Sequence, residues 1–242
     1  MSNQKVAILF FGLTKNVDKS YPSIKKNILD RLTKSNYDYD VFVHTYILDT
    51  YNNLWSNEYT KNYNNEEYKK LKPAHVLLDN QTEIINKLNV QQYYSLKNLG
   101  NWAGVSKSVQ MTKQMIRNMA LALYSKKRII EYFATMRHEY KYVIILRPDQ
   151  CIDSQLNTNC FKLLKHNNIV IPNQHNYNGL NDRMCICKPN VAIMYGRAFK
   201  HLLKYSRRFQ IVSEVFWKYF LIIGCRLIII YSSLKSHLVR IN

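Results

Sequence analysis

Short apolar runs alternate with amphipathic stretches along most of the chain. Continuous apolar runs occupy residues 6–11, 142–146 and 169–172, and a shorter one, 41–43, lies within the segment 37–46. Runs of this kind bounded by turn residues are typical of strands buried on both faces. Further strands are predicted at 73–78, 184–187 and 226–231. Cys185 and Cys187 would share one face of their strand and serve as small core residues.

Between these runs, apolar residues recur at helical spacing. Helices are predicted at 20–34, 81–88, 160–164, 189–205 and 215–222, and one or two helices within 105–138. Ser20 and Ser213 are expected to cap helices, with Glu214 in the first turn after Ser213 and Gly224 ending that helix. Residues 52–72 are polar and predict a loop with a short helix, and residues 97–104 a loop. Alternating strands and helices predict an α/β protein: a single Rossmann-like domain with a central, mostly parallel sheet flanked by helices.

The central predicted strand, 142–146, is followed at once by Arg147, Pro148 and Asp149. Proline ends the hydrogen-bonded ladder because it has no N–H group. Arg147 and Asp149 therefore lie at the carboxyl end of a central strand, where ligands bind in open α/β sheets. From the spacing alone the pair is either such a site or a solvated ion pair at a strand end.

Two other strand ends carry candidate chemistry. The first strand opens into the loop Gly12-Leu13-Thr14-Lys15, which lacks both the dinucleotide-binding fingerprint and the P-loop signature. The second strand ends at His44 and Thr45, and the histidine either contacts a ligand or is a buried structural residue.

Polar and basic residues interrupt the long helical region 105–138, with Ser125 and Lys127 among them. They are either a solvated helix face or a contact to a ligand phosphate, which lysine and arginine side chains favour.

The net charge of the chain limits the kinds of molecule that it is expected to bind. With 242 residues and a formal charge of +19, the chain favours anionic partners such as nucleotide phosphates, nucleic acid or an acidic membrane face. Nineteen tyrosines would suit a nucleic-acid-binding protein, and this alternative stays open. No nucleic-acid partner is expected, because the basic residues are dispersed and no recognised binding motif occurs.

Cysteine spacing and hydropathy bear on the compartment. The five cysteines include no CxxC pair, as expected in a reducing compartment. No signal peptide is expected, because residues 1–5 lead directly into a strand. The most hydrophobic stretch, 215–231, is interrupted by Lys218, Gly224 and Arg226. It therefore predicts helix, turn and strand, without a transmembrane segment.

Taken in order, these motifs resemble small glycosyltransferases of the GT-A fold, of families found in large DNA viruses and in bacterial capsule or lipopolysaccharide loci. Five motifs carry the resemblance, each in its expected structural context: Gly12-Leu13-Thr14-Lys15, Asp40-Val41-Phe42-Val43-His44-Thr45, Arg147-Pro148-Asp149, Gly179-Leu180-Asn181-Asp182-Arg183 and Glu214. The resemblance covers nearly the whole chain, and it implies a cytoplasmic protein, in the host cytoplasm if the chain is viral.

The resemblance implies a transferase that moves a hexosyl or pentosyl group from a nucleotide-diphosphate sugar, with a UDP-sugar favoured, to a hydroxyl of an oligosaccharide or other glycan acceptor. Residues 1–150 would mainly hold the donor and residues 151–242 mainly the acceptor. The donor-binding residues would be Phe11, Gly12, Leu13, Thr14, Lys15, His44, Thr45, Ser125, Lys127, Arg147 and Asp149.

The resemblance also implies a divalent cation, Mn²⁺ or Mg²⁺, that bridges the donor phosphates. Asp149 and His237 would be its ligands, with Asp153 a weaker second carboxylate. Arg147 stands where the family has an acidic residue. Two alternatives follow: Asp149 binds a metal, or Arg147 itself neutralises the diphosphate.

An inverting transferase needs a general base to deprotonate the acceptor hydroxyl. Glu214, at the start of a late helix, is favoured by the family's layout, and Asp182 is the rival. Asn181 and Arg183 would bind the acceptor. A retaining enzyme would need no such base, and a catalytically inactive protein of the same fold is a further alternative.

Overall fold

Seven strands form the central sheet of the computed structural model, which describes residues 4–94 and 108–240. The strand order is β10-β8-β9-β6-β1-β2-β5. Every pairing is parallel except those that β9 makes with β6 and β8. The predicted α/β class, with a mostly parallel Rossmann-like sheet, is confirmed. The strands are β1 (Gln4–Phe11), β2 (Tyr37–Ile47), β5 (His75–Asn80), β6 (Tyr142–Leu146), β8 (Asn168–Pro172), β9 (Met184–Cys187) and β10 (Ile228–Ser232).

The strand order reverses at β1. The chain lays β2 and then β5 on one side of β1, and it later returns to place β6 on the other side. Phe10 of β1 pairs with Leu146, near the end of β6, and Phe11 pairs with His44 of β2. The carboxyl ends of β1 and β6 therefore meet at a topological switch point, where ligands bind in sheets of this kind.

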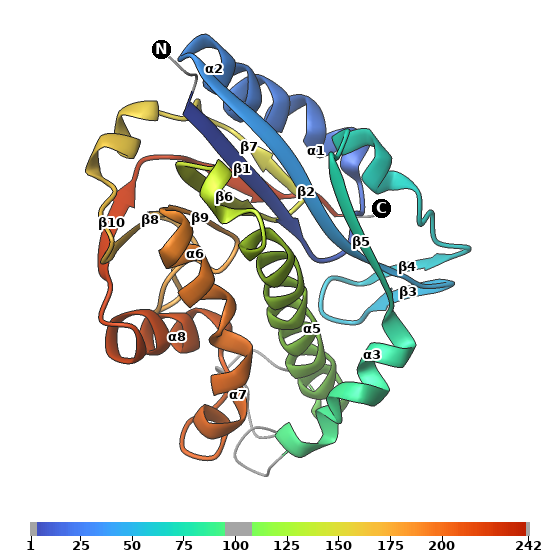
Figure 1. Ribbon diagram of the computed structural model, residues 1–242. Helices are drawn as coiled ribbons and strands as arrows, with labels where there is room; N and C mark the ends of the chain where they lie inside the picture. The colour runs from blue at the N-terminus through green and yellow to red at the C-terminus, as the bar shows by residue number, and fades with distance from the viewer. Residues whose placement is uncertain (1–3, 95–107, 241–242) are drawn as a thin grey trace.

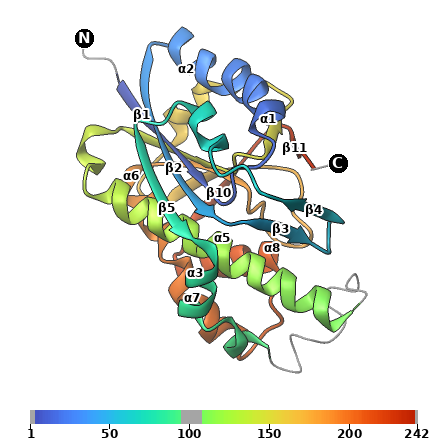
Figure 2. The ribbon, with the colours of Figure 1, turned by 90° about the vertical axis from the view of Figure 1, so that its right-hand side faces the viewer.

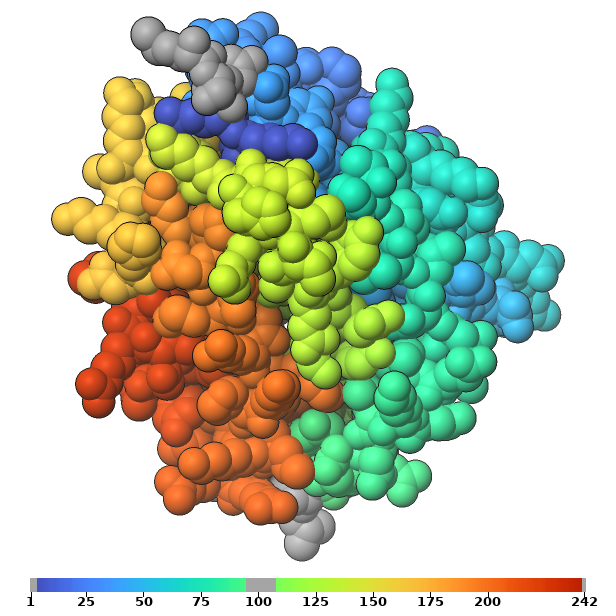
Figure 3. Space-filling view, in the orientation of Figure 1, coloured from blue at the N-terminus to red at the C-terminus, as the bar shows by residue number. Residues whose placement is uncertain are grey.

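Helices cover both faces of the sheet (Figures 1 and 2). One face carries a continuous helical segment made of α1 (Val17–Ile24), the π-helical turn η1 (Lys25–Leu29) and α2 (Asp30–Lys34). The other face carries the long helix α5 (Val109–Ala134), together with α6 (Pro189–Gly196), α7 (Ala198–Ser206) and α8 (Ser213–Lys218), which continues as η7 (Tyr219–Gly224). In the space-filling view α5, α6 and α7 hide most of the sheet (Figure 3).

Strand β1 shows why both faces need this cover. Its side chains alternate between the faces. Ala7 and Leu9 join the cluster formed with α5 and α6, whereas Val6 and Ile8 join the cluster formed with α1 and α2. All four are fully buried. The continuous apolar run of this strand thus follows from burial on both sides.

Smaller elements fill the connections. A hairpin of β3 (Thr50–Asn53) and β4 (Glu58–Lys61) follows β2, and β7 (Gln150–Ile152) pairs antiparallel with β11 (Ser236–Leu238). The remaining helices are α3 (Gln81–Leu88) and the short turns η2 (Glu67–Leu71), η3 (Val90–Tyr93), η5 (Arg137–Glu139) and η6 (Thr158–Leu163).

Several predicted boundaries were wrong. The β3–β4 hairpin begins at Thr50 and extends into the segment 52–72, which was predicted as a loop with a short helix, because these strands are held by polar contacts and show no apolar alternation. The helix predicted over 189–205 is two helices joined at Arg197, and the one predicted at 160–164 is the 3₁₀ turn η6. The three-residue strands β7 and β11 were not predicted. Residues 97–104 and the start of the helix predicted from residue 105 lie outside the described residues.

Both expected serine caps were also wrong. Ser20 lies inside α1, and its hydroxyl donates to the Pro148 carbonyl at 2.6 Å. The N-cap residue of α8 is Val212, which precedes the helix, and the Ser213 hydroxyl donates to Asp182 Oδ2 at 2.5 Å. In each case a tertiary hydrogen bond to a motif predicted to be functional takes the place of a local cap.

The apolar stretch 215–231 folds as α8, η7 and β10, as predicted. Within the described residues, no helix has both the length and the apolar character needed to cross a membrane.

Candidate functional site

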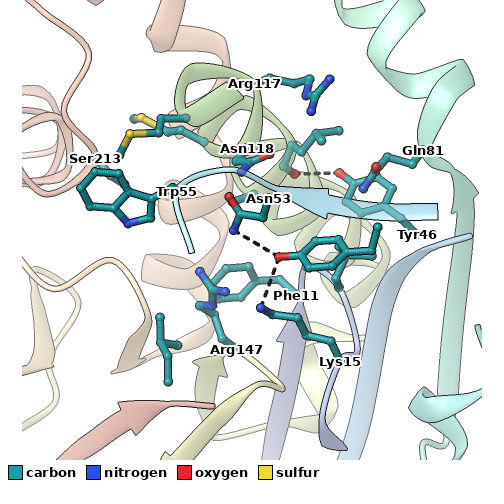
Figure 4. Close-up of a pocket in the computed structure, with 18 of the residues that line it drawn as sticks. Phe11, Lys15, Tyr46, Asn53, Trp55, Gln81, Arg117, Asn118, Arg147 and Ser213 are labelled. Atoms are coloured by element: carbon teal, nitrogen blue, oxygen red, sulfur yellow. Dashed lines mark hydrogen bonds between the residues drawn. The ribbon is translucent and has the colours of Figure 1, made fainter. Parts of the chain in front are cut away.

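A cavity of about 460 Å³ opens at the carboxyl ends of β1 and β6 (Figure 4). Its walls come from the β1 loop, the β3–β4 hairpin, α5, the start of α8 and the segment after β11. The structure thereby brings together side chains from both halves of the chain. The predicted site residues that line it are Phe11, Gly12, Leu13, Lys15, Arg147, Asp182, Arg183 and Glu214.

The loop after β1 turns at Gly12, whose φ of +91° is one that residues with a side chain rarely adopt. No other atom lies within 4 Å of the position that a Cβ would occupy, so backbone is exposed to the cavity there. The Gly12 N–H donates to Ser125 Oγ of α5 at 2.7 Å. This bond fixes the loop against the long helix.

A buried polar network lies behind this loop. Ser125 Oγ is 2.6 Å from His44 Nδ1, and His44 Nε2 is 3.1 Å from Asp79 Oδ2, which also accepts from Arg128. Burial lowers the pKa of His44, which favours a neutral ring that donates from Nε2 to Asp79 and accepts at Nδ1. The network thus orients the Ser125 hydroxyl that accepts the hydrogen bond from the Gly12 N–H.

Four residues predicted to bind the donor therefore do not lie in the cavity wall. Thr14, His44, Thr45 and Ser125 are fully buried and do not line the cavity. Thr14 and Thr45 bond to each other through their hydroxyls. Hydrogen bonds to one another and to the loop hold these side chains behind the cavity wall, so they shape the loop without lining the cavity.

Lys127 is also not part of the cavity wall. It lies on α5 with its amine 3.7 Å from Glu131, one helical turn away. Its direction on the helix, set by the burial of the neighbouring Ser125 and Lys126, turns it away from the site.

The strand-end pair forms a closed ion pair. Arg147 donates from Nε to Asp149 Oδ1 at 2.8 Å and from Nη2 to Oδ2 at 2.7 Å. The Asp149 side chain is 2% exposed and that of Arg147 is 31% exposed, so the arginine covers the carboxylate and faces the cavity. Burial alone would raise the pKa of Asp149, but Arg147 and then Lys15 hold it below its ordinary value.

These residues do not fit the predicted metal site. Both oxygens of Asp149 are occupied by Arg147, and Lys15 Nζ is 3.9 Å from Oδ2, so a divalent ion would meet two positive charges. The second predicted ligand, His237 on β11, is exposed and bonds through Nδ1 to Asp153 at 3.0 Å. Across residues 4–94 and 108–240, no group of three or more His, Cys, Asp or Glu side chains is arranged to hold a metal.

The glycine loop before β9 packs directly on the start of α8. A Cβ on Gly179 would lie 2.0 Å from the carbonyl carbon and oxygen of Glu214, and the Leu180 N–H donates to that oxygen at 2.9 Å. Only glycine allows so close an approach between two backbones. The Gly179 loop and Glu214 are therefore one structural unit, although they are far apart in the sequence.

Asn181 was expected to bind an acceptor, but it is 2% exposed and does not line the cavity. Its Oδ1 accepts from the backbone N–H groups of Arg183 and Met184, and its Nδ2 donates to the Gln174 carbonyl. These bonds occupy both polar atoms of the amide group and hold the loop so that the neighbouring Asp182 and Arg183 line the cavity.

Asp182 and Glu214, the two candidate bases, lie in the same wall of the cavity. Burial, and then the negative charge of Asp182, raise the pKa of Glu214 to about 7. The Ser213 hydroxyl donates to Asp182 Oδ2 and holds that side chain in the same wall. Burial and the neighbouring charge thus leave Glu214 able to exchange a proton near neutral pH.

One of the basic residues that interrupt the helical region 105–138, but that was not among the candidate site residues, lies beneath this pair. Lys126 of α5 is 2% exposed, and its Nζ donates to the Asp182 carbonyl at 2.7 Å. The same nitrogen lies 4.3 Å from the centre of the Phe11 ring and 4.5 Å from that of Trp217. Burial lowers the pKa of Lys126 to about 8. A signal was present: Lys126 falls on the apolar stripe of its helix, seven residues after Met119.

The remaining wall comes from residues with no sequence signal. Trp55, at the turn of the β3–β4 hairpin, is 42% exposed and lines the cavity, as do Asn118 and Arg117 of α5. Figure 4 shows Arg117 at the opposite end from Arg147 and Lys15, with Asn118 between them. The cavity thus has one end at the strand termini and another bounded by α5.

Comparison of the chain with models of protein families finds no match, and comparison with curated protein sequences finds none either.

Proposed function

We propose that this protein is a glycosyltransferase that moves a sugar from a nucleotide-diphosphate donor, with a UDP-sugar favoured, to a hydroxyl group of a glycan acceptor. The observation that carries the proposal is the meeting, in one cavity, of a switch-point loop, a cationic strand end and a carboxylate poised near neutrality. The order of the five sequence motifs supports the same class of reaction.

The donor would lie across the carboxyl ends of β1 and β6. Gly12 offers a backbone that a nucleotide can approach closely, and Arg147 and Lys15 offer positive charge to its phosphates. The sugar would then extend toward the wall formed by Asp182 and Glu214.

Glu214 would act as the general base of an inverting transfer. Its ionised carboxylate takes the proton of the acceptor hydroxyl as that oxygen attacks the anomeric carbon. The new glycosidic bond forms while the bond from that carbon to the donor's phosphate oxygen breaks, and the nucleoside diphosphate leaves with the bonding electrons. A pKa of about 7 leaves roughly half of Glu214 ionised at neutral pH while keeping it basic enough to accept the proton.

Thermal-shift measurements with UDP-, GDP- and dTDP-sugars test the donor class, because a ligand that binds only the folded state raises the unfolding midpoint. One nucleotide should raise the midpoint more than the others. A single-stranded DNA oligonucleotide belongs in the same panel. Stabilisation by the DNA with none by any nucleotide sugar would reject the proposal and favour the nucleic-acid-binding alternative.

A further inference from the structure

The wall of the proposed donor cavity carries more cations than carboxylates. Its cationic wall residues are Lys15, Arg117, Arg147, Arg183 and Arg240, whereas its carboxylates are Asp182 and Glu214. Two more carboxylates, those of Glu58 and Asp149, lie beneath the surface with side chains 0% and 2% exposed. They hold the cations in place without themselves facing a ligand.

Arg147 retains hydrogen-bonding capacity toward the cavity. A guanidinium has five N–H donors, and Asp149 takes one from Nε and one from Nη2. The remaining N–H groups belong to a side chain that is 31% exposed and lines the cavity. The buried carboxylate fixes the plane of this guanidinium, so little conformational entropy is lost when it binds an anion.

Arg240 is brought to the same place by the C-terminal strand. Strand β11 pairs with β7, and the Val239 N–H donates to the Asp149 carbonyl at 2.9 Å. The next residue, Arg240, lines the cavity, and its Nη1 lies 3.7 Å from Glu58 Oε2 of the β3–β4 hairpin. Residues 238–240 are therefore held beside both the Arg147–Asp149 turn and the β3–β4 hairpin.

We infer that Arg147 and Arg240 together hold the donor's diphosphate and that this protein binds it without a divalent metal ion. The inference rests on the proposed function. When the sugar leaves, negative charge grows on the diphosphate, and the two arginines compensate it by charge-assisted hydrogen bonds. Asp149, which the resemblance offered as a metal ligand, instead anchors one of the two arginines.

Isothermal titration with UDP, GDP and dTDP, each in EDTA and in Mn²⁺, tests the inference. We expect the nucleoside diphosphate that binds to do so with equal affinity in both conditions, and we expect Arg240→Gln to weaken its binding by about tenfold or more in EDTA. Arg240→Gln should fold, because Glu58 keeps Lys15 at 2.7 Å. Arg137→Gln, which removes an exposed charge outside the cavity, is the matched control and should leave the affinity unchanged.

The outcomes separate the two proposals. Binding that requires Mn²⁺ would overturn the inference and leave the proposed function standing. The inference would also be overturned if the nucleotide binds without metal and Arg240→Gln weakens that binding no more than Arg137→Gln does. If none of the three nucleotides binds with or without Mn²⁺, the proposed function fails, and the inference fails with it.

Discussion

Replacing Glu214 by glutamine should make the protein more stable at alkaline pH and much slower as a transferase. The carboxyl group has an ordinary pKa of 4.5, and burial together with Asp182 raises it to about 7 in the folded state. The folded state therefore binds the proton more tightly than the unfolded state does. The ionised carboxylate of Glu214 destabilises the folded state. This free-energy cost is absent below pH 4.5, grows between pH 4.5 and 7, and is fully present above pH 7.

The size of the effect follows from the two pKa values. A difference from 4.5 to about 7 corresponds to about 3 kcal/mol at pH 8. At pH 5 the same linkage gives less than about 1 kcal/mol. Glutamine has nearly the same shape and no charge, so Glu214→Gln should gain most of this free energy at pH 8 and little at pH 5. Loss of the general base should lower the transfer rate by roughly 10²–10⁴-fold.

Urea unfolding of both proteins at pH 5 and pH 8 measures the difference in the free energy of unfolding. Glu83→Gln is the matched control, because Glu83 also lies in the first turn of a helix but is exposed. A gain at pH 8 no larger than that of the control, or a gain that does not depend on pH, would refute the electrostatic reasoning. Full activity of Glu214→Gln would refute its role as the base.

Three further outcomes are expected. Lys126→Met should shift the acidic limb of the pH–rate profile to higher pH, because Lys126 helps to lower the pKa of Glu214, and an unchanged limb would exclude that coupling. Gly179→Ala should destabilise the protein by about 1–3 kcal/mol through backbone overlap, measured against Gly224→Ala, whose added methyl meets only ordinary contacts. Ser125→Ala should cost about 1–3 kcal/mol and weaken nucleotide binding, because the loop glycine loses the acceptor of its N–H group, and unfolding and titration measure the two effects.

Periodicity alone revealed most of the sheet. Strands buried on both faces require continuous apolar runs, and this constraint is local enough to read from the residues of β1 and β6. The strands β3 and β4 were not predicted, for the opposite reason. Glu58 in β4 is buried as the partner of Lys15, and no local pattern distinguishes such a residue from one in a polar loop.

The sequence by itself determined the types of residue at each strand end, and with them the Gly12 loop, the Arg147–Asp149 pair and the two carboxylates. Only the tertiary structure decided which of these side chains face the cavity. Asp149 and Asn181 are turned inward by hydrogen bonds to their neighbours, whereas Arg147 and Glu214 line the cavity. The physical reason is that burying a polar group costs free energy unless hydrogen-bonding partners offset it. Those partners come from segments far apart in the chain.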